Sequence, residues 1–394
     1  MKKTQLAAAL SLSAISLPTL AMVGTDARSA GMGGTGVASA DHITAPFYNP
    51  AQMKKFEAND DFGLLLPSAF VGANTTEDLD SKIDQFQLAN KELKSAQQAA
   101  VPNAARLEAA ADNWKVKLKG LDNSGFSMGL GVNFAVAIPN SLMPVNVFSK
   151  NDVHTEFLID IDTEQLDKDD DQLDAGTSNV QLVAGSVSDI GVSVARDVLV
   201  PYVNETISLG FSPKIQRLTV YNAFENLDTF DNDSYELSSE YQQKTTFNVD
   251  FGASYRPITP VTVALSATNL IPQELDSLND NGSVATFRVE PSVTAGAAYD
   301  NGWLLAAADI DLTEKRLFKD VTKGEQYARL GVEFDALNWA QLRAGYSISM
   351  VDGSEDLVTL GVGFSPFGVL GVDVATQVAG DNEFHVAAEL RLSL

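Results

Sequence analysis

Charged side chains recur at every second position within otherwise apolar segments of this sequence. Ten of them share this setting: Asp250, Arg256, Arg288, Glu290, Asp309, Arg329, Glu333, Arg343, Glu389 and Arg391. Because side chains two positions apart in a strand point to the same side, each segment would present its charges on one face. Carboxylates and guanidinium groups facing one interior either pair and hold the strands in register, or line a polar path or ligand site. The sequence leaves both interpretations open.

Other chemistry has little support in the sequence. The chain has no cysteine, which excludes disulfides, thiolate nucleophiles and zinc-thiolate sites. His42, His154 and His385 do not have the spacing of metal ligands. The aspartate-rich segment 160–171 is similar to a calcium loop, but it lacks the required glycine and glutamate at the sixth and twelfth positions. No nucleophile motif of a hydrolase stands out, so we expect no enzymatic activity, no cofactor and no metal.

A glycine-rich hexapeptide, Gly31 to Gly36, matches the dinucleotide-binding pattern literally. That chemistry requires a buried strand before the glycines and a helix after them, so that the pyrophosphate meets a helix N-terminus. No alternating strand and helix pattern surrounds this segment. We therefore reject nucleotide binding and expect the glycines to let the chain bend tightly in a confined space.

The segments that carry the charges have the pattern of β-strands with one apolar and one polar face. In the last segment the apolar residues are Phe384, Val386, Ala388, Leu390, Leu392 and Leu394, and polar or small residues lie between them. The runs 247–255 and 287–299 repeat this pattern. A soluble β-sandwich also alternates. A closed barrel in a bacterial outer membrane requires the alternation, because one face meets lipid and the other a wet interior.

The connections between these segments distinguish the two folds. Short connections rich in Pro, Gly, Asn and Asp lie at 139–141, 197–203, 257–260, 300–302, 336–338 and 366–368. Longer ones lie at 73–123, 163–178, 223–240, 270–283, 313–325, 350–355 and 379–382. Their regular alternation predicts an all-β fold, a transmembrane antiparallel β-barrel of about 14 strands with short periplasmic turns. Trp303 and Trp339 directly follow two of these turns, at the height of interfacial aromatic residues.

The N-terminus and the net charge indicate where the protein works. Residues 1–21 have the pattern of a signal peptide, and their apolar stretch is shorter than the roughly 20 residues of a membrane-spanning helix. The formal net charge is −25, which opposes binding to nucleic acid. Much of the acid lies in 160–174, 225–240 and 276–280, where we expect solvated loop surface. We expect an exported protein in the outer membrane of a Gram-negative bacterium, in contact with outer-membrane lipid.

One long connection has a helical pattern. Apolar residues recur with helical spacing at Leu79, Ile83, Phe86 and Leu93, and again at Leu107, Ala111, Trp114 and Leu118. Asn103 is placed to cap the second helix. We predict a helical hairpin, inserted at residues 77–119, over the outer mouth of the barrel. It either packs only on itself or offers a docking surface to a ligand or partner.

The N-terminal part of the mature chain resembles a known superfamily. The segment 26–41, followed by Phe47-Tyr48-Asn49-Pro50-Ala51, is similar to the mature N-terminus of the FadL-like outer-membrane barrels. Within that superfamily, the segments 60–67 and 268–276 resemble the plasmid-transfer TraF-like family, which differs from the thioredoxin-like proteins of the same name. The resemblance implies that residues 22–58 form a plug inside a barrel of residues 59–394. The plug motif would comprise Gly31, Gly33, Gly34, Asn49, Pro50 and Ala51.

The resemblance implies two alternative functions. Similarity to fatty-acid transporters implies passive transport of small apolar molecules through a side opening in the wall, with a small hydrophobic ligand as partner. Similarity to the TraF-like family implies a structural or interaction component of the cell envelope, associated with conjugative plasmid transfer and with envelope or conjugation proteins. Pro144, early in the predicted third strand, would remove a ladder hydrogen bond. It marks either an opening in the wall or an ordinary strand start.

Overall fold

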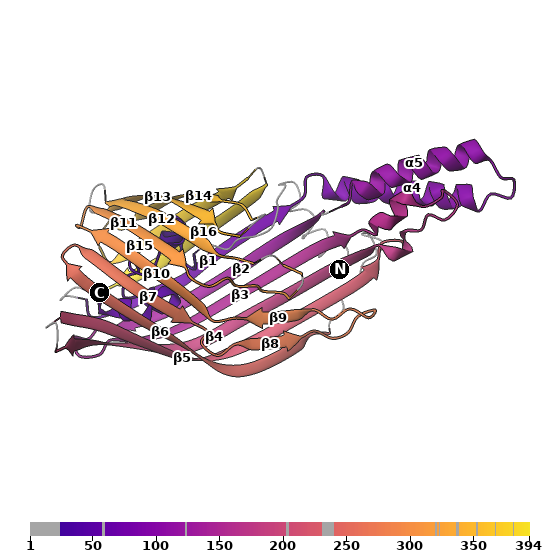
Figure 1. The fold of residues 1–394 in the computed structure, drawn as a ribbon. Coiled ribbons are helices and arrows are strands. Elements are labelled where there is room, and N and C mark those ends of the chain that lie inside the picture. The colour runs from indigo at the N-terminus through magenta and orange to yellow at the C-terminus, as the bar shows by residue number, and fades with distance from the viewer. Residues whose placement is uncertain are drawn as a thin grey trace.

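The protein folds as one closed barrel (Figure 1). The computed structural model describes residues 24–56, 60–122, 124–201, 205–230, 240–319, 321–322, 324–335, 339–351, 354–366, 368–380 and 382–394. The expected signal peptide, residues 1–21, and the expected turn at 336–338 lie outside the described residues. Fourteen antiparallel strands form the barrel, so the predicted fold class and strand number are confirmed.

Every barrel strand pairs with its neighbours along the chain. The strands are β1 (Gly63–Thr75), β2 (Gly125–Ile138), β3 (Val145–Asp160), β4 (Asn179–Val200), β5 (Glu205–Asn226), β6 (Gln242–Ile258), β7 (Val261–Thr268), β10 (Ser292–Asp300), β11 (Leu304–Asp311), β12 (Tyr327–Asp335), β13 (Ala340–Ser349), β14 (Leu357–Phe364), β15 (Leu370–Ala379) and β16 (Glu383–Ser393). Pairing of β1 with β16, for example Leu64 with Leu392, closes the ring. Closure leaves no unpaired edge in the described barrel sheet, as a lipid environment requires.

Alternation along the strands sorts side chains between the outer surface and the interior. In β14 the outward residues Val358, Leu360, Val362 and Phe364 are exposed and every residue between them is buried. The runs 247–255 and 384–394 follow the same rule, as the sequence predicted. Strands β4 and β5 have 22 residues each, about twice the length needed to cross a bilayer. This side of the barrel therefore continues beyond the membrane toward the helices (Figure 1).

Two tryptophans mark the periplasmic end of the outer surface. Trp303 and Trp339 directly precede β11 and β13, and they are 56% and 41% exposed. Their rings pack edge-to-face on Phe334 and Phe364, with centroids 5.8 and 5.4 Å apart. Amphipathic rings at this height are typical of the membrane interface. Their exposure next to strand ends agrees with the interfacial position predicted from the sequence.

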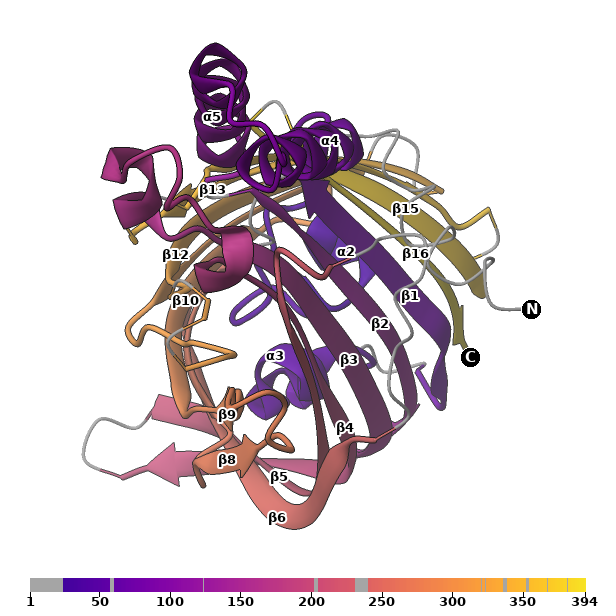
Figure 2. The same ribbon diagram turned by 90° about the vertical axis from the view of Figure 1, so that its right-hand side faces the viewer.

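The prediction of one continuous strand over 287–299 is wrong. Residues Thr286–Val289 form β9, which pairs with β8 (Gln273–Asp276) in a separate two-stranded sheet at the outer mouth (Figure 2). Pro291 has no backbone N–H and lies at the break before β10. Phe287 does not face lipid, because it is fully buried and its ring centroid lies 5.2 Å from that of Phe318.

The connection after β1 forms the predicted helices, α4 (Leu79–Gln97) and α5 (Ala104–Lys119). Asn103 caps α5, because its side chain accepts a hydrogen bond from the backbone N–H of Arg106. Trp114 is fully buried and its indole N–H donates to Asn90. Among the described helices, none combines the length and the hydropathy needed to cross a membrane.

The helical hairpin differs from the predictions that it lies over the mouth and that it packs only on itself. The hairpin continues outward from the rim beyond β1 and β2 and does not fold across the opening (Figures 1 and 2). It also does not pack only on itself, because Phe157, Leu173 and Phe230 of neighbouring strands and loops share its buried cluster. An ion pair between Lys94 and Asp228 adds a polar contact to this packing. The hairpin is thus one unit with the outer loops.

Pro144 is an ordinary strand-start residue, and the interpretation as a wall opening is wrong. It directly precedes β3, so it removes no hydrogen bond from the described ladder. The wall is irregular instead near Pro67 in β1, where the register shifts toward β2 and toward β16. A proline there leaves one ladder position without a donor.

Candidate functional site

Residues 24–56, called the plug below, lie inside the barrel, as the resemblance implied (Figure 2). The plug has little regular structure: α2 (Ala27–Ala30), α3 (Ala45–Tyr48) and the 3-10 turn η2 (Pro50–Lys54). Most of its residues are buried by the barrel wall. It adds no strand to the sheet, so the barrel ladder does not depend on it.

Inward side chains of the barrel satisfy the backbone of the plug. Asn133 donates to Thr25 O at 2.6 Å, and Gln377 donates to Ala30 O at 2.9 Å. Buried backbone groups outside helices and sheets need such partners. Uncharged polar side chains on the inner face, such as Asn133 and Gln377, therefore hold the irregular plug by hydrogen bonds to its backbone.

The glycines of the plug allow backbone contact with the wall. Gly33 (φ +68°) and Gly34 (φ +76°) adopt the left-handed conformation that favours glycine. The plug backbone then lies on wall glycines: a Cβ on Gly345 would collide with Gly33 N, and a Cβ on Gly331 would collide with Met32 O. Side chains at these wall positions would displace the plug.

Asn49 and Pro50 join two parts of the plug. Asn49 is fully buried, its Nδ2 donates to Val37 O at 3.0 Å, and its Oδ1 accepts from Ala51 N at 3.0 Å. The second bond caps η2, and Pro50 occupies the first position of that turn. The Nδ2 also lies 3.3 Å from Ala253 O of β6. The Asn-Pro-Ala motif thus fixes the plug internally and against the wall.

Six charged side chains, called the latch below, form a ring of ion pairs between plug and wall: Arg28, Asp41, Glu333, Arg343, Asp373 and Arg391. Arg28 of the plug donates two hydrogen bonds to Glu333, both at 2.8 Å. Arg343 bridges Glu333 and Asp373. Arg391 bridges Asp373 and Asp41, and Asp41 lies 3.9 Å from Arg28. Three cations and three carboxylates alternate, so the ring is neutral and each charge is compensated.

Two more carboxylates of the wall hold plug backbone. Asp309 Oδ2 accepts from Gly36 N at 2.8 Å and from Val37 N at 3.0 Å. Glu389 Oε2 accepts from Ala27 N at 2.9 Å. These bonds give buried backbone N–H groups of the irregular plug the partners they need. The plug is therefore fastened at both its latch and its glycine-rich bend.

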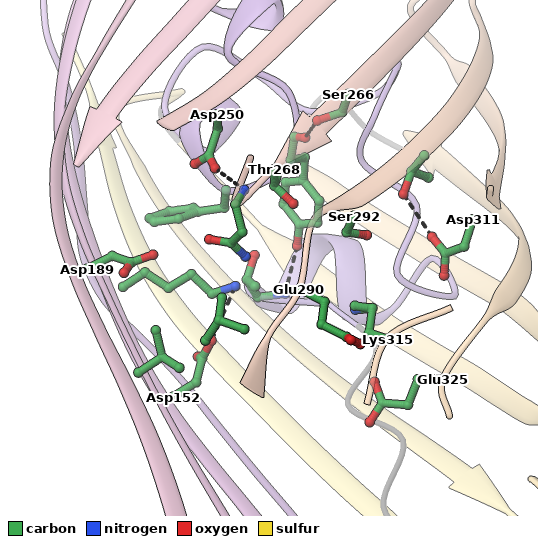
Figure 3. A pocket seen from close by; sticks show the side chains of 18 of the residues that line it. Asp152, Asp189, Asp250, Ser266, Thr268, Glu290, Ser292, Asp311, Lys315 and Glu325 are labelled. Atoms are coloured by element: carbon green, nitrogen blue, oxygen red, sulfur yellow. Dashed lines mark hydrogen bonds and ion pairs between the residues drawn. The ribbon is translucent and has the colours of Figure 1, made fainter. Parts of the chain in front are cut away.

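A cavity of about 260 Å³, called the chamber below, lies between the plug and the outer loops. Its charged lining residues come from facing walls and from the loops (Figure 3): Lys150, Asp152, Asp189, Lys214, Asp250, Arg288, Glu290, Asp309, Asp311, Lys315, Arg316, Glu325 and Arg329. Its uncharged polar lining includes four hydroxyls: Ser266, Thr268, Ser292 and Thr294. Many of these groups are paired, which makes the chamber polar without a large charge of one sign.

The paired charges of the chamber are preorganised. Lys214 Nζ lies 2.9 Å from Asp189 and 3.0 Å from Asp250, and all three side chains are buried. Arg329 donates two hydrogen bonds to Asp311, at 2.8 and 2.7 Å. Parallel bonds of this kind fix the geometry of both groups.

The structure divides the ten predicted luminal charges among several places. Asp250, Asp309 and Arg329 line the chamber, Glu389 holds the plug, and Glu333, Arg343 and Arg391 belong to the latch. Arg288 and Glu290 reach the chamber from the outer loop rather than from a barrel strand. Arg256 is apart from the others, exposed at the periplasmic end of β6.

Sequence reasoning missed several residues of this interior. Arg28 and Asp41 lie in a segment without strand periodicity, and nothing in their spacing marks them. Asp189 and Lys214 lie at inward positions of β4 and β5, and alternation in those strands could have revealed them. Within the described ranges, no three His, Cys, Asp or Glu side chains come together as metal ligands.

Solved outer-membrane channels share this architecture. The toluene transporter TbuX of Ralstonia pickettii is 13% identical, with a TM-score of 0.56 over 94% of this chain and 98% of that one. The CymD monoaromatic hydrocarbon channel is 12% identical, with a TM-score of 0.56 over 95% and 99%. A FadL homologue of Pseudomonas aeruginosa is 12% identical, with a TM-score of 0.51 over 96% and 98%. Similarity at these identities establishes the fold.

Comparison of sequences identifies the family of this chain. No curated protein sequence matches this chain. One family model, described as the F plasmid transfer operon TraF protein, matches residues 46–311. That region includes the Asn-Pro-Ala motif, the helical hairpin and the strands from β1 to β11. The chain has the FadL-like outer-membrane barrel fold and belongs to this TraF family.

Proposed function

We propose that this protein is a passive channel for small molecules across the outer membrane of a Gram-negative bacterium, and that the plug controls it. The chamber carries this proposal, because it places solute-sized space directly against the plug inside a closed barrel. The plug is held by side-chain contacts and is not woven into the sheet. It can therefore shift without breaking a strand pair.

Two observations bear on which solute the channel carries, and they point to different solute classes. Fold relatives named as toluene transporters and monoaromatic hydrocarbon channels support small apolar molecules, the cargo class expected from the resemblance. That support rests on the fold alone at 12–13% identity. The chamber itself is lined by charged and hydroxyl groups. The proposal therefore commits to a channel, and the solute class is argued from the lining below.

The test is solute entry into vesicles that contain lipopolysaccharide and the purified protein. Alanine serves as the polar probe and toluene as the apolar one, for the wild type and for a variant lacking residues 24–56. We expect at least one probe to enter faster than into protein-free vesicles, and faster still without the plug. A folded, plug-free barrel that admits neither probe would rule out the channel.

A second function, a structural or interaction component of the cell envelope associated with plasmid transfer, is supported by the family description. The hairpin α4–α5 offers a surface for it, because it stands outward from the rim and packs firmly on the outer loops. A deletion strain tests this function in mating assays, with a strain complemented by the whole gene as control. Plasmid transfer that stays unchanged in the deletion strain would remove this function.

A further inference from the structure

The lining of the chamber determines which solutes it can hold. Figure 3 shows carboxylates of opposite walls, among them Asp189 and Asp311, around one space, with Glu290 and Lys315 from the outer loops. A charged group that loses water without gaining a hydrogen bond is strongly destabilised. A hydrocarbon in this space would displace water and return no hydrogen bond. A solute with charged groups of its own would replace the lost hydrogen bonds.

Two lining groups of opposite charge have unused binding capacity. Asp152 Oδ2 lies 3.2 Å from Lys150, whereas its Oδ1 is buried and accepts no hydrogen bond from a described residue, so a rotation of the carboxylate has to turn it toward the chamber. Lys315, on the outer loop between β11 and β12, has no carboxylate of a described residue within 4.0 Å of its ammonium group, and Asp311 and Glu325 attract it from farther away. The other cations of the facing walls, Lys214 and Arg329, are already paired. Asp152 and Lys315 therefore offer one acceptor and one cation to the same space.

The size of the chamber limits the solute. A volume of 260 Å³ corresponds to roughly nine water molecules at about 30 Å³ each. That space is enough for a molecule of amino-acid size. The hydroxyls of Ser292 and Thr268 add uncharged hydrogen-bonding groups to the same lining.

Resting on the proposed channel function, we propose that the chamber binds a small zwitterion of amino-acid size. Its ammonium group contacts Asp152, and its carboxylate contacts Lys315. The opposite charges compensate each other in the bound solute, so binding does not upset the near balance of charge in the lining. A single-charged analogue of the same size satisfies only one of the two residues.

The experiment compares three probes in vesicles containing lipopolysaccharide: alanine, lactate of matched size, and toluene. It uses the full chain, as wild type and as Arg28→Ala to loosen the plug. Lys315→Gln and Asp152→Asn are each introduced into both backgrounds. Lys319→Gln is the matched control, because Lys319 is exposed on the same loop and does not line the chamber. Circular dichroism and resistance to unfolding on gels verify that each barrel is folded.

We expect alanine to enter faster than lactate and both chamber variants to slow alanine entry about tenfold, the effect of losing one charge-assisted hydrogen bond. Lys319→Gln should leave the rate of alanine entry unchanged. Entry of toluene without alanine would overturn the zwitterion proposal and leave the channel standing. Alanine entry that both chamber variants leave unchanged would overturn the assignment to Asp152 and Lys315. Folded protein that admits none of the probes in either background would overturn the channel and this proposal together.

Discussion

Arg28 in the plug and Glu333 in β12 meet through two parallel hydrogen bonds, both 2.8 Å long. The two residues are 305 positions apart in the sequence. The pair is shielded from water, with side-chain exposures of 15% and 14%. A fork-to-fork contact of this kind fixes direction as well as distance. It therefore sets the position of the plug relative to the wall and makes Arg28 the first residue to test.

Arg28→Ala should loosen the plug without unfolding the barrel. It removes two hydrogen bonds between ions, each contributing about 1.5–3 kcal/mol to plug docking, while Glu333 keeps Arg343 and Asp41 keeps Arg391 as a partner. The sheet ladder contains no plug residue, so barrel stability should change little. Single-channel recording should show more frequent openings than in the wild type.

The matched control for Arg28 is Arg106→Ala. Arg106 lies on the exposed helical hairpin, where its guanidinium contacts only Ser95 among the described hydrogen bonds. It should leave the recordings unchanged. Arg28→Lys keeps the charge and loses the two-pronged geometry, so it should lie between wild type and alanine. Identical openings in all four proteins would show that the latch does not hold the plug.

Gly345→Ala should displace the plug through a change in the barrel wall, since Gly345 lies in β13. The added Cβ meets backbone atoms of Gly33 and Met32, which cannot rotate away. We expect plug contacts to be lost while the strand pairing of β13 persists, and protease should cleave the plug in the folded variant. Gly120→Ala is the control, since the nearest atom to its added Cβ lies at 3.4 Å, an ordinary contact. Equal protease resistance of both variants would contradict backbone contact between wall and plug.

The sequence predicted the barrel because its strongest physical constraint is local. Alternation of outward Phe384 and Leu390 with inward His385 and Glu389 follows from the geometry of a single strand. Turn residues then fixed the number of strands. The same local rule failed at Phe287, because alternation does not distinguish a barrel strand from a strand of the short β8–β9 sheet. Pro291 was the one signal in the sequence for the break between β9 and β10.

The interior could not be predicted in the same way. Arg28 and Asp41 join a ring of charges whose four other members lie more than 290 residues later in the chain. Such pairings depend on the barrel being closed and on where the plug turns back at Gly33 and Gly34. The types of the wall charges were visible in the sequence, but their partners were not.

Docking of the helical hairpin should weaken in acid. Burial alone would raise the pKa of Asp228, but hydrogen bonds from Lys94 and Asn90 lower it below its ordinary value. A carboxyl whose pKa is lowered on docking stabilises the docked state above its ordinary pKa and loses this effect as the pH falls through the lowered one. Docking should thus be constant near neutral pH and weaken below about pH 4.

Spin labels at Leu88→Cys and Thr229→Cys can report this docking, because the chain has no other cysteine. Their distance distribution should broaden below pH 4. The same labels in an Asp228→Asn background should give a broader distribution at pH 7 and less change with pH. A pH response that Asp228→Asn retains in full would assign the effect to another group.

Variants of the buried triad Lys214, Asp189 and Asp250 should show that the stability of the chamber wall depends on pairing each buried charge with an opposite one, and not on the presence of charges. Lys214→Met removes the only cation that the described ion pairs give to either carboxylate, and should cost about 3–5 kcal/mol in urea unfolding. The triple variant with Asp189→Asn and Asp250→Asn as well removes the charges together, and should lie much closer to the wild type, since uncharged replacements of buried ion pairs are often neutral. If single and triple variants lose equal stability, packing of the lysine stem, rather than charge compensation, holds this part of the wall.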